Sequence, residues 1–365
     1  MPTIAVRAAK DRRFFPLDRK LRLRADHWSE GAARVATRQG LQAKSFDLAA
    51  EAYTEAVGGA ISADSLQRIT EGWGAQVEQQ RTAEAECANA PAQRGETPRT
   101  QRVTEIVPLS ERANISTDGT MILIRGERWK EVKLTAISAV TVQTAGERAA
   151  QQARPSRRER DPLVRLSQHS YQAGLWDADT LGRHQYTEGL RRGVERCATL
   201  SSVNDAAEWI ERITQTNFAR AVQIVDWSHG SGRLWDVGKA ILGEGKPETQ
   251  HWVAAHLDQL WVGEVSAVIT ALEGLEPKST ESAELVRQAT VYFRNQAPRM
   301  RYAEFRAQGL FVGSGVVEAG CKTLIGQRLK QSGMEWSVRG ANAIISLRCI
   351  IKSNRFEDYW ESRAL

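Results

Sequence analysis

The feature that most limits the possible folds is a change of pattern near residue 112. Before it, apolar residues recur at helical spacing; after it come alternating and continuous apolar runs typical of strands. The expected strands are residues 113–118, 120–124, 131–142, 197–203 and 221–225. Gly119 and Gly126 are expected turn residues, and helical segments separate the later strands. This order predicts a mixed sheet flanked by helices, an α/β fold.

The segment before this change, residues 1–83, is expected to be mainly helical. It contains two runs with helical spacing, separated by a pair of glycines, which together have the outline of a helix-turn-helix. Such a unit would expose Gln67 and Arg68 to base edges in DNA. A helical hairpin that serves only for packing is the alternative. Residues 84–111, rich in alanine, proline and polar residues, are expected to be a linker.

The long segment of residues 234–308 is expected to be a helical insertion in the second domain, residues 112–365. Three tryptophans, Trp235, Trp252 and Trp261, are expected in its own small core. A β-rich segment there would contradict this interpretation.

Composition excludes some classes of protein and favours a polyanionic partner. The 365 residues carry a formal net charge of +6, and no window has the roughly 18 apolar residues of a membrane helix. The four cysteines are far apart and form no CxxC pair, so neither a local zinc finger nor a disulfide framework is expected. We expect a cytoplasmic protein. A soluble enzyme that is merely basic is the less specific alternative.

Three acidic residues lie at the edges of expected elements. Asp118 ends a strand-like run, Asp205 follows a strand and precedes a helix, and Glu318 lies within a helix. Each also has an ordinary structural explanation. Asp205 and Glu208 fit a capping box, Asp118 before a glycine fits a turn, and Glu318 with Lys322 fits a helix ion pair.

The chain resembles the DDE insertion-sequence transposases of the Kra type, relatives of Mutator-like elements. The matching stretches are VGSGVVEAGCKTLIGQRLKQSGMEW at 312–336, AVQIVDWSH at 221–229, the Asp-Gly pair at 118–119 and FFPLD at 14–18. The resemblance covers nearly the whole chain.

The resemblance implies an RNase H-like core that cleaves DNA with two Mg²⁺ (or Mn²⁺) ions. Its first catalytic acid would be Asp118 on the first strand, and its third Glu318 on a late helix. The second would be Asp205, after the fourth strand. The competitor is Asp226, which belongs with His229 to a separate Asp-x-x-His signature near the site.

The chemistry of such a site agrees with these residue types. Crowded carboxylates repel and raise one another's pKa unless a cation lies between them, and Mg²⁺ prefers carboxylate ligands. Lys322, Arg328 and Lys330 would give the helix of Glu318 a cationic face that holds DNA phosphates, with a solvated basic face as the alternative. Trp336 and Trp360 are expected in the core rather than stacked on bases.

The expected function is therefore transposition: cleavage at transposon ends and strand transfer into target DNA. A homodimer or larger assembly on DNA and association with the nucleoid are expected with it. The family usually has a cysteine-rich zinc-binding segment upstream of FFPLD and glycine beside the second acid, and this sequence departs at both places. These departures favour the alternative function, a catalytically inactive or domesticated DNA-binding protein.

Overall fold

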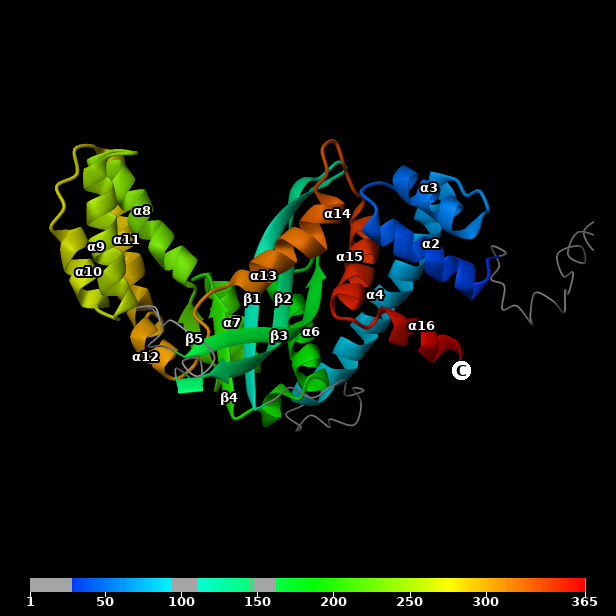
Figure 1. The fold of residues 1–365 in the computed structure, drawn as a ribbon, viewed down its shortest axis with the longest axis horizontal. Coiled ribbons are helices and arrows are strands. Elements are labelled where there is room, and N and C mark those ends of the chain that lie inside the picture. Colours follow the sequence, from blue (N-terminus) through cyan, green and yellow to red (C-terminus); the bar gives the residue numbers. More distant parts are fainter. Residues whose placement is uncertain (1–27, 94–110, 145, 148–161, 365) are drawn as a thin grey trace, which may run out of the picture.

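A five-stranded mixed sheet lies at the centre of this computed structural model, which describes residues 28–93, 111–144, 146–147 and 162–364 (Figure 1). The strands are β1 (Arg112–Ile124), β2 (Arg128–Gln143), β3 (Leu163–Gly174), β4 (Thr199–Asn204) and β5 (Val222–Val225). Their order in the sheet is β3-β2-β1-β4-β5. The first three strands pair antiparallel, and β4 and β5 are parallel to β1. The expected α/β class, a mixed sheet flanked by helices, is confirmed.

Helices flank the sheet in four groups. The N-terminal group is α2 (Glu30–Gln42), α3 (Phe46–Val57) and α4 (Ala63–Gln93). Between the strands lie α6 (Ala178–Arg191), the 3₁₀ turn η2 (Val194–Arg196) and α7 (Glu208–Asn217). After β5 come α8 (Trp227–Leu242), α9 (Pro247–Trp261), α10 (Val265–Glu273), α11 (Thr280–Gln296), η3 (Ala297–Arg299) and α12 (Tyr302–Ala307). The last group is α13 (Gly315–Gly320), the π-helix η4 (Cys321–Gly326), α14 (Gln327–Leu329), α15 (Val338–Lys352) and α16 (Phe356–Ala364).

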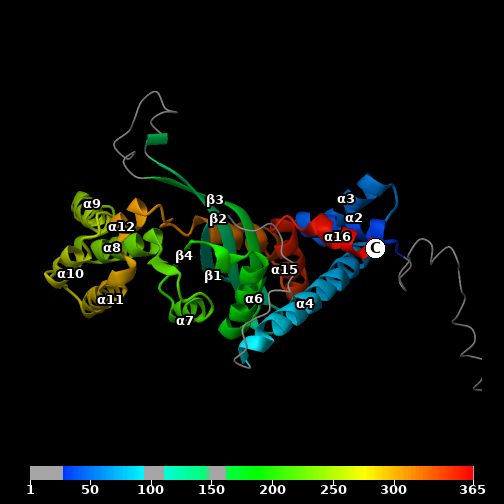
Figure 2. The ribbon, with the colours of Figure 1, turned by 90° about the horizontal axis from the view of Figure 1, so that it is seen from below.

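Opposite faces of β1 are covered by different helices. Thr117 accepts a hydrogen bond from Gln185 of α6, whereas the next residue, Asp118, accepts one from Cys321 at the start of η4. Successive residues of a strand point to opposite faces, so α6 and the α13–η4 segment lie on the two sides of the sheet. Figure 2 shows the sheet between the insertion helices at one end and the N-terminal helices at the other.

β1 is continuous where the sequence suggested a turn. Gly119 pairs with Lys133 of β2 in the same antiparallel register as its neighbours, so Asp118 lies inside a strand rather than at its end. The expected break was wrong because the ladder with β2 holds the glycine in extended backbone. The expected turn at Gly126 is present between β1 and β2, with φ 76°.

The expected linker is helical where the structure describes it. Residues 84–93 form the end of α4, and residues 94–110 lie outside the described part. Asn89 of α4 donates hydrogen bonds to the Arg183 carbonyl (3.2 Å) and Thr187 Oγ1 (3.4 Å) of α6. Contacts with α6 therefore continue a helix that composition alone would end earlier.

The N-terminal helices share a hydrophobic core with the sheet. Leu66 and Trp73 of α4 belong to the same buried cluster as Leu134 of β2. At Gly74 the backbones of α4 and α15 are so close that a Cβ would lie 2.3 Å from the Ala343 carbonyl oxygen. The expected helical pair is present as α3 and α4, packed on the main body. The core positions expected for Trp336 and Trp360 are confirmed, since both are buried in this cluster.

The insertion is helical throughout, as expected, but its helices begin at Trp227, before residue 234. Its core contains Val253, Leu260 and Phe293 and joins Ile224 at the end of β5. The expectation for Trp235 was wrong. This side chain is 37% exposed, because it lies on the outer face of α8, and the other two tryptophans are only half-buried. In the residues described, no helix has the length and apolar character needed to cross a membrane.

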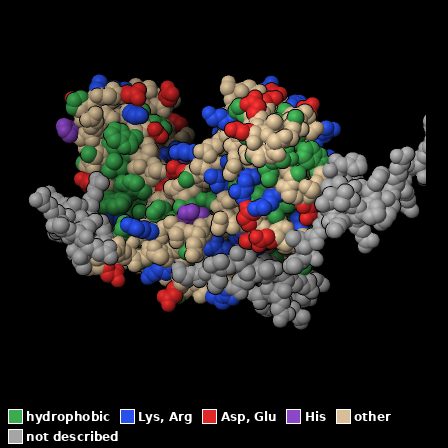
Figure 3. All heavy atoms as spheres, turned by 45° about the vertical axis from the view of Figure 1, so that its right-hand side comes forward, with side chains coloured by type: hydrophobic (Ala, Val, Ile, Leu, Met, Phe, Trp, Pro, Cys, Tyr) green, Lys and Arg blue, Asp and Glu red, His purple; other side chains and the backbone are tan. Residues whose placement is uncertain are grey.

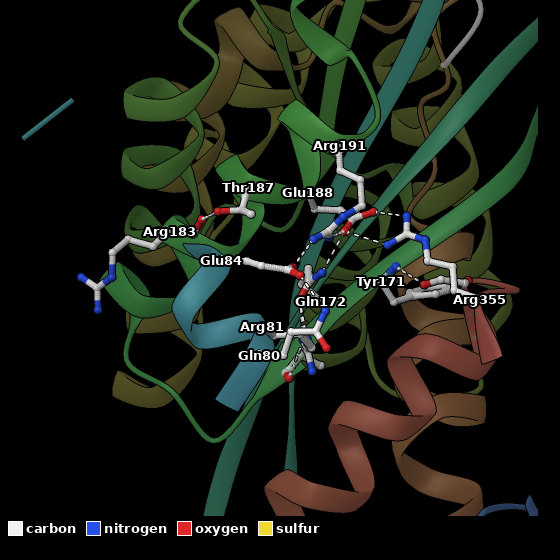
Figure 4. A network of polar contacts seen from close by, with 12 residues as sticks. Gln80, Arg81, Glu84, Tyr171, Gln172, Arg183, Thr187, Glu188, Arg191 and Arg355 are labelled. Atoms are coloured by element: carbon white, nitrogen blue, oxygen red, sulfur yellow. Dashed lines mark hydrogen bonds and ion pairs between the residues drawn. The ribbon is translucent and has the colours of Figure 1, made fainter. Parts of the chain in front are cut away.

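A buried polar network ties α4, α6 and β3 to the chain after α15 (Figure 4). Its centre is Glu188, which is fully buried. Its carboxylate accepts from Arg355 (2.5 and 3.1 Å), Arg191 (2.6 Å) and Gln172 (2.8 Å), and Arg81 donates to Gln172 in turn (3.0 Å). Burial alone would raise the pKa of Glu188, but the two arginines lower it well below its ordinary value. The network therefore holds an ionised carboxylate in the interior.

Candidate active site

The parallel strands bring Asp118 and Asp205 to the same level of the sheet. In the register of β1 with β4, Ile115 pairs with Ser202. Continuing that register by three residues places Asp118 beside Asp205, which directly follows β4. Neighbouring strands are about 4.8 Å apart, so the two aspartates lie at adjacent positions, Asp118 within β1 and Asp205 just past the end of β4.

Asp226 occupies the equivalent position one strand further out. Asn204 pairs with Val225 in the parallel register of β4 and β5, and the Asp226 amide donates to the Asn204 carbonyl (2.8 Å). The next step of the register brings Asp226 level with Asp205. Since β4 lies between β1 and β5, Asp205 is one strand nearer to Asp118 than Asp226 is.

The segment that contains Glu318 covers Asp118 from one face of the sheet. Cys321 Sγ donates to Asp118 Oδ2 (3.6 Å), and the Gly119 amide donates to Asp118 Oδ1 (2.7 Å). Glu318 itself is turned toward Ser314, whose hydroxyl lies 2.5 Å from Glu318 Oε1. Among the residues that the structure describes, no three His, Cys, Asp or Glu side chains form a ready-made group of metal ligands.

Asp226 is buried and its carboxylate accepts hydrogen bonds from neighbouring residues of the protein. It is 1% exposed and caps α8. Its carboxylate accepts from the amide (2.9 Å) and hydroxyl (2.7 Å) of Ser314, from the amide (3.3 Å) and hydroxyl of Ser228, and from His229 Nδ1 (2.9 Å). The two amides and His229 take three of the roughly four lone-pair positions of an ionised carboxylate, and a hydroxyl of Ser314 or Ser228 can take the fourth. Asp226 joins the start of α8 to the loop before α13.

Ser314 lies between two carboxylates. Its hydroxyl is within hydrogen-bond distance of both Asp226 and Glu318, but a hydroxyl has a single hydrogen to donate. Asp226 is also bonded to the Ser314 amide, whereas Glu318 is held by hydroxyl groups alone: that of Ser314 and, at 3.4 Å, that of Ser228. Glu318 is therefore the acid that turns most readily within this set.

The electrostatics show that the three aspartates and His229 share one field. Burial raises the pKa of Asp118, and the charge of Asp205 raises it further against the opposing hydrogen bond from Gly119. The hydrogen bond to Asp226 raises the pKa of His229, and the charges of Asp205 and Asp118 add to this. Burial would raise the pKa of Asp226, but the hydrogen bonds it accepts outweigh burial and lower the pKa.

The ordinary structural roles considered for Asp205 and Glu318, a capping box with Glu208 and an ion pair with Lys322, are not present. Asp205 Oδ1 accepts from the Ala207 amide (3.0 Å), so it closes a local turn, while α7 has no side-chain cap and no capping box with Glu208. Glu318 bonds to serines rather than to Lys322, although both residues are in the described chain.

The expected cationic face of the Glu318 segment is only partly present. Lys322 and Lys330 are exposed, and Lys330 Nζ donates to Thr120 Oγ1 (3.1 Å), on the same face of β1 as Asp118. Arg328 was wrongly expected to contact DNA. It is 1% exposed, and its Nε donates to the Gly40 carbonyl (2.8 Å). Burial lowers the pKa of Arg328 to about 10.

The expected base-reading residues of α4 bond within their own helix. Gln67 Nε2 donates to Glu71 Oε1 (2.7 Å), and Arg68 donates to Ser65 Oγ (3.1 Å). Arg68 is exposed and Gln67 half-buried, so both remain candidates for contact with DNA.

Sequence reasoning missed several residues of the site. Cys321, which contacts Asp118, lies one turn after Glu318, so helical spacing could have found it. The contact of Ser314 with Asp226 had no such signal, because only the fold brings these two residues together. Comparison with known proteins adds no relative: no family model matches the chain, and no curated protein does.

Proposed function

We propose that the protein is a DDE-type DNA transposase, which cleaves DNA at transposon ends and transfers the strands into target DNA. The observation that carries this proposal is the alignment of Asp118 and Asp205 on adjacent parallel strands, with the helix of Glu318 over them. Such an arrangement suits phosphodiester chemistry, where positioning and charge stabilisation do most of the work.

The order of elements supports an RNase H-like core. In the transposases that the chain resembles, the first acid lies on the first strand, the second after the fourth strand and the third on a late helix. Asp118 lies on β1, Asp205 directly follows β4, and Glu318 lies on α13. The helical insertion lies between the second and third acids, which accounts for their wide separation in the sequence.

The donor set fits divalent metal ions. Asp118 and Asp205 are like charges at adjacent positions, and the raised pKa of Asp118 reflects their repulsion as well as burial. Asp118, Asp205 and Glu318 would hold Mg²⁺ or Mn²⁺, while Asp226 is buried and already accepts from two backbone amides and His229. When bound, two such ions would supply the charge stabilisation that phosphodiester cleavage needs.

The other residues position these acids and the DNA. Asp226 fixes the loop before α13 through Ser314 and so sets where Glu318 lies. His229 has a raised pKa, which favours its cationic form beside a DNA phosphate. Lys322 and Lys330 offer two further exposed cations.

One observation favours the second candidate function, an inactive transposase derivative that binds DNA. Glu318 is turned toward Ser314, and the described residues hold no preformed three-ligand group. An active enzyme must turn Glu318 toward the two aspartates when metal and DNA bind, whereas a DNA-binding derivative need not.

The test is a cleavage assay with end DNA of the element that encodes the chain, in Mg²⁺ or Mn²⁺. We expect strand cleavage by the wild type and its loss in Asp118→Asn, Asp205→Asn and Glu318→Gln, with DNA binding retained. The matched control is Glu208→Gln, an exposed acid three residues after Asp205, which should cleave normally. Wild-type binding without cleavage would favour the inactive derivative. Full activity in Asp118→Asn would overturn the assignment of the site.

A further inference from the structure

The insertion presents a row of donors next to the acids. α8 begins at its cap, Asp226, and His229 and Arg233 follow at positions three and seven, which lie on one face of a helix. His229 bonds to Asp226, and Arg233 is exposed one turn further on. This face of α8 therefore leads directly away from the three aspartates, Asp118, Asp205 and Asp226.

A second helix of the insertion adds Tyr292 to this face. The guanidinium of Arg233 lies over the Tyr292 ring, 5.1 Å from its centroid. The next residue of α11, Phe293, is buried in the core that includes Val225, the last residue of β5. Beyond α11, Arg299 Nη1 bonds to Glu211 of α7 (3.0 Å). The end of α11 is thus fixed against the strand and the helix that border the acids.

The hydroxyl of Tyr292 is an available donor. Burial raises the pKa of Tyr292 to about 12, with the charges of Asp205 and Asp226 adding to burial and Arg233 opposing it. The phenol is therefore neutral and protonated at ordinary pH. Within the described chain, neither this hydroxyl nor the Arg233 guanidinium has a hydrogen-bond or ion-pair partner; their contacts are between the rings and the guanidinium.

We infer that Arg233 and Tyr292 bind a backbone phosphate of the DNA strand at the acid site, so that the insertion forms one wall of the DNA channel. The inference rests on the proposed function, since it takes DNA as the substrate. A guanidinium and a phenol with free donors and no acceptor partner suit an anion, and the arginine offsets the repulsion between a phosphate and Asp205.

The shape of the molecule allows such a path for DNA. Figure 3 shows the lobe of the insertion helices standing apart from the rest of the molecule, with a hollow between them. Lys and Arg side chains gather on the opposite side of this hollow (Figure 3). The lobe itself shows mainly hydrophobic side chains toward the hollow (Figure 3), so the inference assigns the phosphate contact on that side to Arg233 and Tyr292.

The experiment measures binding of a short end-DNA duplex without divalent metal, at several salt concentrations. Arg233→Gln should weaken binding about fivefold at low salt and reduce the slope of log affinity against log salt by about 0.9, the loss of one phosphate contact. Tyr292→Phe should weaken binding about threefold and leave the slope unchanged, because it removes a neutral donor. Lys239→Gln is the matched control, an exposed cation further along α8 that pairs with Glu244 and should change neither quantity.

Thermal unfolding of each variant distinguishes this role from a purely structural one. A variant that merely loosened the contact between α8 and α11 would lower the melting temperature without changing the salt slope. Wild-type affinity and slope in Arg233→Gln would overturn the inference, as would a wild type that does not bind the duplex. Reduced DNA affinity and a reduced salt slope in Arg233→Gln would support the inference even if the wild type did not cleave DNA. Binding and cleavage therefore test the two proposals separately.

Discussion

Replacing Asp118 with asparagine should stabilise the protein when no metal is present. Burial raises the pKa of Asp118 and the charge of Asp205 raises it further, so the ionised side chain is unfavourable in the folded state. Asparagine removes that charge and keeps an oxygen to accept from the Gly119 amide (2.7 Å). A residue required for activity would thus be one that lowers stability.

The size of the effect follows from the spacing of the strands. Carboxylates on adjacent strands, about 5–6 Å apart, repel by about 1.5–3 kcal/mol at an effective dielectric constant of about 20–40. Asp118 is partly exposed, and solvent screening reduces the net gain on substitution to about 1 kcal/mol. For 365 residues that gain corresponds to a melting temperature higher by about 1–2 °C. Because the folded pKa is raised, the advantage of asparagine is present at neutral pH and disappears as pH falls through that pKa.

The assay is thermal unfolding of the wild type and Asp118→Asn, with and without MgCl₂. Without metal the variant should melt higher; with MgCl₂ the wild type should gain stability and the variant should gain much less. Asp258→Asn, an exposed aspartate on α9, should match the wild type under both conditions. A lower melting temperature for Asp118→Asn without metal would refute the electrostatic reasoning. An equal MgCl₂ shift in both proteins would refute the metal site.

Two further predictions concern stability and the role of buried charges. Glu188→Gln should lower the free energy of unfolding by about 3 kcal/mol in urea, because Arg355, whose side chain is 13% exposed, loses its carboxylate and Arg191 keeps only Glu84. Glu84→Gln, whose side chain is 31% exposed, should cost less than about 1 kcal/mol. The reverse order would contradict the network. Arg328→Leu should cost about 2 kcal/mol with DNA affinity unchanged, whereas Lys330→Gln should weaken DNA binding with stability unchanged. Affinity loss in Arg328→Leu without loss of stability would make Arg328 a DNA contact after all.

Local patterns in the sequence predicted four of the five strands, but β3 (Leu163–Gly174) was not among the expected strands. The apolar run at 221–225 and the run at 197–203 became β5 and β4 with shifts of one or two residues. The break expected at Gly119 did not occur, because pairing with β2 overrides the local preference of a single glycine. The end of α4 was missed for a similar reason: contacts with α6, and not composition, keep residues 84–93 helical.

The burial of Arg328 could not be predicted from helical spacing. Counting turns from Glu318 assumes a regular α-helix, but residues 321–326 form a π-helix. A π-helix has more residues in each turn, so every later residue is rotated relative to the α-helical expectation. Arg328 consequently points into the core, where Phe46 and Trp336 lie against its guanidinium, while Lys330 stays exposed.

The positions of Tyr292 and Trp235 depend on how the insertion packs, which no local pattern encodes. Both residues lie on helices with ordinary amphipathic spacing. Only the docking of α11 against the core that includes β5, through Phe293, decides that Tyr292 lies against Arg233 of α8. Trp235 is exposed for the same reason, since the face of α8 that meets the core is formed by Leu234 and Val237.

Residues 312–336, the stretch that most closely resembles the transposases, contact several separate parts of the fold. Ser314 bonds to Asp226, Cys321 to Asp118 and Arg328 to the Gly40 carbonyl of α2. The π-helix between them is stabilised from α15, where Arg348 donates to the carbonyls of residues 323 and 324. A change of one residue in this segment would therefore disturb the aspartates Asp118 and Asp226, the N-terminal helices or α15.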